Sequence, residues 1–209
     1  MNLIGYTIFI ALSNNIDNIT ARIAYSIRGI HISLPINLYI SFITFVISGL
    51  AAYSGTTISN ILSQRTTSII AMILLTAIGL WMILEPYIRR QKDNSDNGDT
   101  HISQEERPGI MQVLSEPEKA DMDKSMHIDF KEATILGIAL SINNIGGGLS
   151  AGMIGINALA MGLLSALVNF IALWAGNYIA EFFIKWNLHK KAAFVGGLIL
   201  IGIGIEQLF

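Results

Sequence analysis

The sequence has no cysteine and few charged residues. Only 13% of its 209 residues are Asp, Glu, Lys or Arg, whereas a soluble domain carries about 25%. The absence of cysteine excludes disulfides, thiolate metal sites and a cysteine nucleophile. The formal net charge is −2, and no large basic patch is present, which argues against nucleic acid as a partner.

The few charges are concentrated in the middle of the chain. The chain has 13 basic and 15 acidic residues, and 19 of these charged residues lie between Glu85 and Glu132. The two flanking parts therefore cannot present a charged surface to water, and the mean hydropathy of the whole chain is +0.55. We predict a multi-pass protein of the cell membrane, embedded in the lipid bilayer, with one water-exposed central segment.

The apolar stretches are long enough for membrane helices, each of which needs roughly 20 mostly apolar residues. The fold class expected is an all-α membrane protein with six transmembrane helices. The predicted spans are Leu3–Ile27, Leu34–Leu62, Thr67–Tyr87, Ala133–Ile156, Ala158–Ile184 and Ala192–Phe209.

Lys and Arg residues near the span ends predict the orientation, because cytoplasmic loops carry an excess of them. The second loop has only Arg65, and the fourth has none. Both termini are therefore expected outside the cell, and the central loop in the cytoplasm. The basic residues of the three predicted cytoplasmic loops are Arg28 in the first, Arg89, Arg90, Lys92 and Lys131 in the third, and Lys185, Lys190 and Lys191 in the fifth.

The two halves of the chain resemble each other. Asp17-Asn18-Ile19 aligns with Asn143-Asn144-Ile145, and Ser54-Gly55 resembles Ala175-Gly176. Because three spans are an odd number, the second half enters the membrane from the opposite side. Transporters commonly use this plan, with the site near the midplane between the halves. The predicted organisation is two inverted three-helix repeats, residues 1–87 and 132–209, joined by a flexible cytoplasmic linker, residues 88–131.

Polar side chains lie inside the first and fourth predicted spans. Asn14, Asp17 and Asn18 share one helix face, because residues three and four apart are neighbours. Asp17 is expected at mid-depth, where a carboxylate costs several kcal/mol unless it is paired, hydrated or protonated. Asn143 and Asn144 reach the corresponding depth in the fourth span. We expect these five residues to line one site, with Asp17 and Asn143 as metal ligands, because oxygen-rich sites suit hard divalent cations such as Mn²⁺.

Two alternatives stay open for these residues. The asparagines can serve packing alone, by hydrogen bonding across helices. Arg22 lies about 140° around the helix from Asp17. It is expected to extend toward the cytoplasmic face; otherwise it reaches the site as a built-in cation that repels a divalent ion. Thr20 and the serines have no His or Lys at mid-depth, so no catalytic triad or dyad is predicted and the chain is not expected to be an enzyme.

The motifs of both halves resemble the manganese efflux pump (MntP) family, and most closely its sporulation membrane protein branch, YtaF. The family pattern is Ser-Leu-Asp, a small residue, Phe and spaced glycines, once per half. The resemblance implies six spans and, in the pump branch, export of a divalent cation. This sequence departs from the family pattern at two positions: Asn143 stands in place of the second Asp, and Arg22 stands in place of a glycine. The matching segments here are Asn15-Ile16-Asp17-Asn18-Ile19, Ser141-Ile142-Asn143-Asn144-Ile145-Gly146-Gly147-Gly148, Tyr25–Ile32 and Gly202–Phe209.

These observations lead to two hypotheses for the function. The first is a secondary transporter that exports a divalent metal such as manganese, with no permanently bound cofactor. Asp17 is then the charged ligand or proton carrier, Asn143 its neutral counterpart, and Asn14, Asn18 and Asn144 auxiliary ligands. The second is a non-transporting membrane protein of sporulation or envelope assembly that keeps the transporter fold.

Overall fold

The computed structural model describes residues 3–27, 30–95, 113, 120–123, 125–186, 194, 198, 201–203 and 205. Over these residues the regular structure is helical, apart from one isolated β-bridge. The helices are α1 (Leu3–Asn14), α2 (Ile16–Ile27), α3 (Leu34–Ile61), α4 (Gln64–Ser95), α6 (Phe130–Met153) and α7 (Ala158–Trp186).

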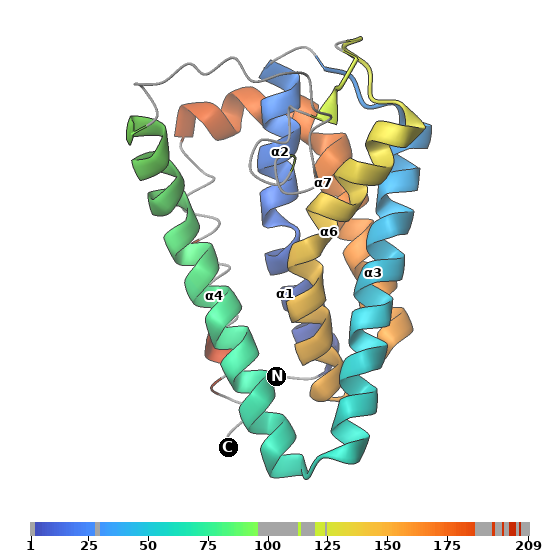
Figure 1. The fold of residues 1–209 in the computed structure, drawn as a ribbon, viewed down its shortest axis with the longest axis vertical. Coiled ribbons are helices and arrows are strands. Elements are labelled where there is room, and N and C mark those ends of the chain that lie inside the picture. The colour runs from blue at the N-terminus through green and yellow to red at the C-terminus, as the bar shows by residue number, and fades with distance from the viewer. Residues whose placement is uncertain are drawn as a thin grey trace.

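Most of the helices lie along the long axis of the molecule and alternate in direction, while the last part of α7 turns across the top of the bundle (Figure 1). The pair α1 and α2 runs upward from the end where the N-terminus lies, α3 returns, and α4 runs upward again. Helix α6 begins at the end of the bundle opposite to the start of α1. Helix α7 then runs back toward the end where α6 begins (Figure 1). The second half of the chain therefore starts from the opposite end of the bundle to the first.

Four described helices are long and apolar enough to cross a membrane. Their outer faces carry large apolar side chains: Phe42 on α3 is 59% exposed and Leu163 on α7 is 56% exposed. Exposed apolar surface on this scale is stable against lipid rather than water. The protein is therefore a multi-pass membrane protein. The four segments are Leu34–Ile61, Gln64–Trp81, Phe130–Met153 and Ala158–Ala175.

The first predicted span, Leu3–Ile27, is two helices instead of the single one expected, because the helix breaks at Asn15. In a continuous helix the Asn15 N–H would donate to the Ala11 carbonyl, four residues earlier. Here the Asn15 side chain takes that acceptor, with Nδ2 2.7 Å from Ala11 O. The backbone N–H of Asn15 donates to Leu12 O instead, at 3.3 Å. Asparagine side chains compete with the backbone in this way.

The helices of the two halves pack closely, with α3 lying along both α6 and α7. Glycines permit the close α3–α6 contact. A Cβ atom on Gly152 would overlap the carbonyl of Ala52, and one on Gly55 would overlap that of Leu149. Small residues allow helix backbones to approach in membranes in this way. Helix α1 packs against α6 and α7, and α2 packs against α7, so helices from both halves surround a common centre.

The later boundaries differ in part from the expected ones. Helix α4 continues to Ser95, beyond the predicted end of its span at Tyr87 and into the segment predicted as a linker. Most of the predicted sixth span, Ala192–Phe209, lies outside the described residues. Its described residue Ile203 is buried in an apolar cluster with Tyr6 of α1.

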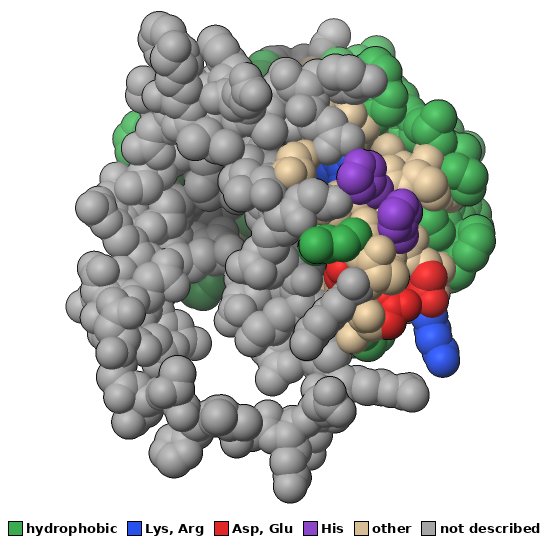
Figure 2. Space-filling model, turned by 90° about the horizontal axis from the view of Figure 1, so that it is seen from above, with side chains coloured by type: hydrophobic (Ala, Val, Ile, Leu, Met, Phe, Trp, Pro, Cys, Tyr) green, Lys and Arg blue, Asp and Glu red, His purple; other side chains and the backbone are tan. Residues whose placement is uncertain are grey.

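Part of the central segment pairs with the loop between α2 and α3. The backbone N–H of His31 donates to Met126 O at 2.8 Å, and the N–H of Ile128 donates to His31 O at 3.2 Å. These bonds form the isolated parallel bridge between His31 and His127. We call residues 120–123 and 125–129 the strap. Figure 2 views this end of the molecule, where the two described histidines lie side by side next to acidic side chains.

Glu132, in the first turn of α6, holds the strap in place. Its carboxylate accepts hydrogen bonds from the Met122 N–H at 2.7 Å and the Asp129 N–H at 3.0 Å. Asp129 in return accepts from the Glu132 N–H at 2.8 Å, which completes a capping box at the start of α6. Ala120 is buried in the same apolar cluster as Tyr25 of α2. The described part of the central segment is therefore packed against the bundle.

Candidate functional site

A reciprocal amide pair joins the two halves at the helix break. Asn15 Nδ2 lies 3.2 Å from Asn144 Oδ1, and Asn144 Nδ2 lies 3.3 Å from Asn15 Oδ1. Both side chains are fully buried. Because a buried amide without a partner costs about 1–3 kcal/mol, the pair holds these two surfaces together. The expected approach of the first and fourth predicted spans is confirmed.

Asn18 on α2 extends this pair toward α7. Its Nδ2 donates to Asn15 Oδ1 at 3.0 Å and to Asn169 Oδ1 at 2.7 Å. An amide nitrogen carries two hydrogens, so both are used and the orientation of the Asn18 amide is set by two oxygen acceptors. Its Oδ1 is consequently left buried, with no hydrogen-bond partner in the part of the chain that the structure describes.

Hydroxyl groups on α3 complete the network from the other side. Asn169 Nδ2 lies 3.2 Å from Thr44 Oγ1 and 3.4 Å from Ser41 Oγ. Thr44 Oγ1 also lies 2.9 Å from Ser141 Oγ on α6. All four side chains are buried. The network therefore ties α2, α3, α6 and α7 together around the amide pair, with residues from both halves of the chain.

Asn14, the last residue of α1, lies beside this network with its hydrogen-bonding capacity unused. Its side chain is 2% exposed, and neither Oδ1 nor Nδ2 has a hydrogen-bond partner among the described residues. The amide fits against α6 at Gly147, where a Cβ atom would overlap it. A buried polar group without a protein partner calls for another one, such as an ion or an ordered water.

Asp17 and Asn143, the two predicted metal ligands, lie on α2 and α6. Asp17 is in the first turn of α2, directly before Asn18, and its side chain lies outside the described residues. Asn143 is half-buried and precedes Asn144. Of the five predicted site residues, the structure brings Asn14, Asn18 and Asn144 to one buried region around Asn15.

The helix break adds backbone groups to this region. The last carbonyls of a helix carry partial negative charge, and the first N–H groups of the next carry partial positive charge. Discontinuous membrane helices use such ends to coordinate transported ions. The end of α1, Asn14 Oδ1 and Asn18 Oδ1 together offer neutral oxygen atoms, the ligand type that hard divalent cations prefer.

Arg22 does not extend to the surface, contrary to the first expectation. It lies one turn after Asn18 on α2 and is 2% exposed, and its Nε and Nη1 have no hydrogen-bond partner among the described residues. The guanidinium is buried because α2 packs against α7. Burying a charge without a partner is costly. This arrangement fits the alternative stated from the sequence, in which Arg22 is a built-in cation near the site.

An acidic cluster in the strap was not expected from the sequence. Carboxylate oxygens of Asp121, Asp123 and Glu132 lie within 4.8 Å of one another. The Ser125 N–H donates to Asp121 Oδ1 at 3.0 Å and to Asp123 Oδ1 at 2.9 Å. Hydrogen bonds from Ser125 lower the pKa of the Asp123 carboxyl. These carboxylates therefore serve as acceptors for the backbone turn that anchors the strap on α6.

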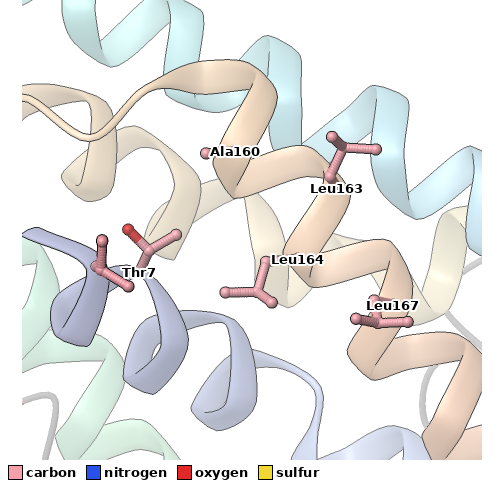
Figure 3. Close-up of a pocket in the computed structure, with 6 residues that line it drawn as sticks. Thr7, Ala160, Leu163, Leu164 and Leu167 are labelled. Atoms are coloured by element: carbon pink, nitrogen blue, oxygen red, sulfur yellow. The ribbon is translucent and has the colours of Figure 1, made fainter.

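An apolar pocket of about 290 Å³ lies between α1 and α7 (Figure 3). The polar side chain that lines the pocket is Thr7, and its hydroxyl donates to Leu3 O of the same helix at 2.8 Å. The pocket therefore does not offer the ligands that a cation needs. Its lining residues are Ile4, Thr7, Ala160, Leu163, Leu164 and Leu167.

The set of residues predicted from the sequence omits Asn15 and Asn169, which hold the network together. The sequence signal that could have indicated a polar partner such as Asn169 lies on the second predicted span. Ser41, Thr44 and Ser48 recur there at spacings of three and four residues, which indicates one polar helix face. A polar face buried in a membrane needs polar partners on a neighbouring helix, and Asn169 is such a partner.

Comparison with known proteins identifies relatives of this chain. A sequence model described as "Putative manganese efflux pump" matches residues 109–208. "Probable sporulation protein YtaF" of Bacillus subtilis (strain 168) is 28% identical over 205 residues, which cover 96% of this chain and 97% of the relative. "Putative manganese efflux pump MntP" of Clostridium perfringens (strain 13 / Type A) is 31% identical over 140 residues, 66% of this chain and 61% of that protein.

A further relative carries the same name. "Putative manganese efflux pump MntP" of Corynebacterium glutamicum (strain R) is 35% identical over 86 residues, 39% of this chain and 43% of that protein. The chain thus spans less than two thirds of either MntP relative and nearly all of YtaF. No solved structure matches it. The sequence matches confirm the resemblance inferred from the short motifs of the two halves.

Proposed function

The chain is related to the manganese efflux pump family, and from this premise we propose that it exports a divalent metal ion such as Mn²⁺. Manganese is then the transported substrate and not a resident cofactor. The observation that carries the proposal is a pair of buried amide oxygens, Asn14 Oδ1 and Asn18 Oδ1, at a broken helix between the two halves, neither of which has a hydrogen-bond partner among the described residues.

The ion would bind at this break. Asp17 provides the negative charge that a divalent cation requires, while Asn14 and Asn18 provide neutral oxygens from the two sides of the break. Asn143 and Asn144 complete the site from α6. The carbonyl end of α1 adds partial negative charge. Because Asp17 is the one acidic residue in the first predicted span, it is also the group that carries a proton if export is coupled to proton movement.

An inverted repeat is part of this proposal, and two hydrogen bonds support it. The offset that aligns Ser54-Gly55 with Ala175-Gly176 also aligns Thr44 with Ser165 and Ser48 with Asn169. Thr44 bonds to Asn169 at 3.2 Å, and Ser48 bonds to Ser165 at 3.0 Å. A two-fold relation between the halves places Thr44 on Ser165 and Asn169 on Ser48. It therefore converts each of these two contacts into the other.

Alternating access follows from such a relation, because the two halves can exchange conformations around a central site. The predicted orientation places both termini outside the cell and the strap on the cytoplasmic side. In the described structure the strap is packed against that end of the bundle, and Ala120 is buried with Tyr25. We assign this arrangement to a state closed toward the cytoplasm.

The decisive experiment replaces the proposed charged ligand. Asp17→Asn keeps the size of the side chain but removes its charge. In cells that depend on this protein for manganese tolerance, we expect the variant to lose tolerance and to accumulate Mn²⁺ as a deletion strain does. Asp96→Asn, in the central segment, is the matched control and is expected to behave like the wild type. Unchanged tolerance and Mn²⁺ efflux in the Asp17→Asn variant, at normal protein levels, rejects the proposal.

A second candidate function is a non-transporting role in sporulation or envelope assembly. It is favoured by the match to YtaF over nearly the whole chain and by the buried Arg22, whose Nε and Nη1 have no hydrogen-bond partner in the described part of the chain. The two candidates separate on one comparison. If a deletion causes a sporulation or envelope defect that Asp17→Asn fully complements, while metal tolerance is unaffected by either change, the second function holds.

A further inference from the structure

Two histidines from distant parts of the sequence are held face to face at the strap. His31 lies before α3 and His127 lies in the strap, and the parallel bridge pairs the two residues directly. Their rings are stacked, with centroids 5.6 Å apart and an interplanar angle of 23°. Both side chains are exposed. The backbone bridge therefore positions two imidazoles next to each other in water.

A hydrogen bond fixes which nitrogen of His127 is free to bind. Its Nδ1 lies 3.2 Å from the carbonyl oxygen of Ser125. A carbonyl oxygen only accepts, so Nδ1 must carry the hydrogen, and the lone pair of the neutral ring is on Nε2. A histidine that ligates a metal characteristically donates its other ring N–H to such a backbone carbonyl, which orients the ring. His127 thus already has the support of a metal ligand.

The surroundings favour a cation. Figure 2 shows the histidines on the same face as acidic side chains of the strap and the start of α6. The carboxylates of Asp121, Asp123 and Glu132 gather within 4.8 Å of one another, and hydrogen bonds from Ser125 lower the pKa of the Asp123 carboxyl. This negative charge raises the local concentration of metal ions.

We propose that His31 and His127 form a metal site at the strap, separate from the transport site. The site takes an imidazole-preferring divalent ion, of the class of Zn²⁺, Ni²⁺ or Cu²⁺. Two metal–nitrogen bonds of about 2.0–2.1 Å require the ligating nitrogens to lie within about 4 Å of each other. The ring centroids are 5.6 Å apart in the stacked arrangement, so binding requires the exposed His31 ring to rotate toward Nε2 of His127. Water completes the coordination. Mn²⁺ binds more weakly at such a site.

The test uses Cu²⁺ as the probe on the full-length protein in detergent, purified through a tag without histidine. Electron paramagnetic resonance reports the number of imidazole nitrogens on the copper. We expect one tight site with two nitrogens in the wild type. His31→Gln and His127→Gln should each leave one nitrogen and weaken binding at least about tenfold. Zn²⁺ should displace the copper at lower concentration than Mn²⁺, as measured by titration calorimetry.

The chain offers matched controls. His101→Gln and His189→Gln remove the two remaining histidines and should leave the spectrum unchanged. Asp17→Asn should also leave it unchanged, so failure of the transport proposal and failure of this one are distinguishable. Circular dichroism and gel filtration verify that each variant is folded. The proposal is overturned if the His31 and His127 variants bind copper as the wild type does. It is also overturned if the wild type binds two copper ions, each through one imidazole nitrogen, and each variant loses one of them.

Discussion

At the scale of single residues, the centre of this membrane protein is built from amides. Asn15, Asn18, Asn144 and Asn169 bond to one another in a buried network. A purely structural network would satisfy all its members, because partly satisfied buried amides are expensive. This one leaves Asn14 and one oxygen of Asn18 unpartnered among the described residues. The unused oxygens are the reason to assign the cluster to binding instead of packing.

The fit of Asn14 against α6 gives a prediction for Gly147. Gly147→Ala places a Cβ atom where the Asn14 amide lies, so the amide must move and overpacking costs about 1–3 kcal/mol. We expect a raised KM for Mn²⁺ export with folded protein still present, measured in membrane vesicles. Gly202→Ala is the control, because its Cβ would meet no described residue within 4 Å. Equal KM values for the two variants would count against Asn14 as a ligand.

The buried charge of Arg22 gives a second prediction. A unit charge and a divalent ion about 10 Å apart repel by about 3 kcal/mol at an effective dielectric constant of about 20. Arg22→Gln removes this repulsion, so we expect Mn²⁺ to bind at least tenfold more tightly, measured by equilibrium binding to the purified protein. Arg65→Gln, an exposed residue at the start of α4, should leave the affinity unchanged. Weaker binding in Arg22→Gln would show that the guanidinium supports the site.

Sequence reasoning at this scale predicted Asn14 and Asn18 from their spacing on one helix face, and Asn144 from the alignment of the two halves. It did not assign Arg22 correctly, because spacing does not reveal whether a neighbouring helix covers a side chain. Asn169 was not assigned to the site for the same reason. Its role depends on Thr44 and Asn18, which are contributed by other helices.

At the scale of elements, the main departure from expectation is the break between α1 and α2. Hydropathy is averaged over all residues of a span. It therefore does not reveal a single side chain, such as that of Asn15, whose hydrogen bond replaces one of the backbone hydrogen bonds. The lengths of α3, α6 and α7 were predicted well, because long apolar runs with clear polar ends fix them. Helix α4 was predicted too short, because helical structure continues into polar sequence up to Ser95.

The cause of the break can be tested by Asn15→Ala. Alanine cannot donate to the Ala11 carbonyl, so the backbone N–H of residue 15 recovers that acceptor and α1 and α2 are expected to join. Amide hydrogen exchange at residues 15–18 should then slow, as followed by mass spectrometry or NMR. Thr44→Ala removes a different member of the network and should not alter exchange at these residues. Fast exchange that persists in Asn15→Ala would assign the break to tertiary packing.

At the scale of the whole molecule, the chain folds as two sets of helices that begin from opposite ends of the bundle (Figure 1). The odd number of predicted spans per half led to this expectation. The strap was not foreseen, because the polar composition of the central segment indicates little apolar surface for burial. Pairing through the backbone of His31, Met126 and Ile128 does not depend on side-chain polarity, so composition could not reveal it.

The strap connects the first half to the start of the second, so fixing it should stop alternating access. Because the chain has no cysteine, His31→Cys combined with His127→Cys introduces one defined thiol pair at the bridged positions. Oxidation of vesicles that contain this double variant should block Mn²⁺ transport, and dithiothreitol should restore it. The two single variants should respond to neither reagent. Full cross-linking with undiminished transport would exclude movement at the strap.

The break at Asn15 also makes the two halves unequal, because α6 runs without interruption from Phe130 to Met153. In a perfectly symmetric inverted repeat, exchanging the conformations of the halves would leave the energy unchanged, and the outward-open and inward-open forms would be equally populated at rest. Here the exchange would require α6 to break and α1 and α2 to join. If the chain is the transporter proposed above, its resting population is therefore biased toward one form even without an ion gradient.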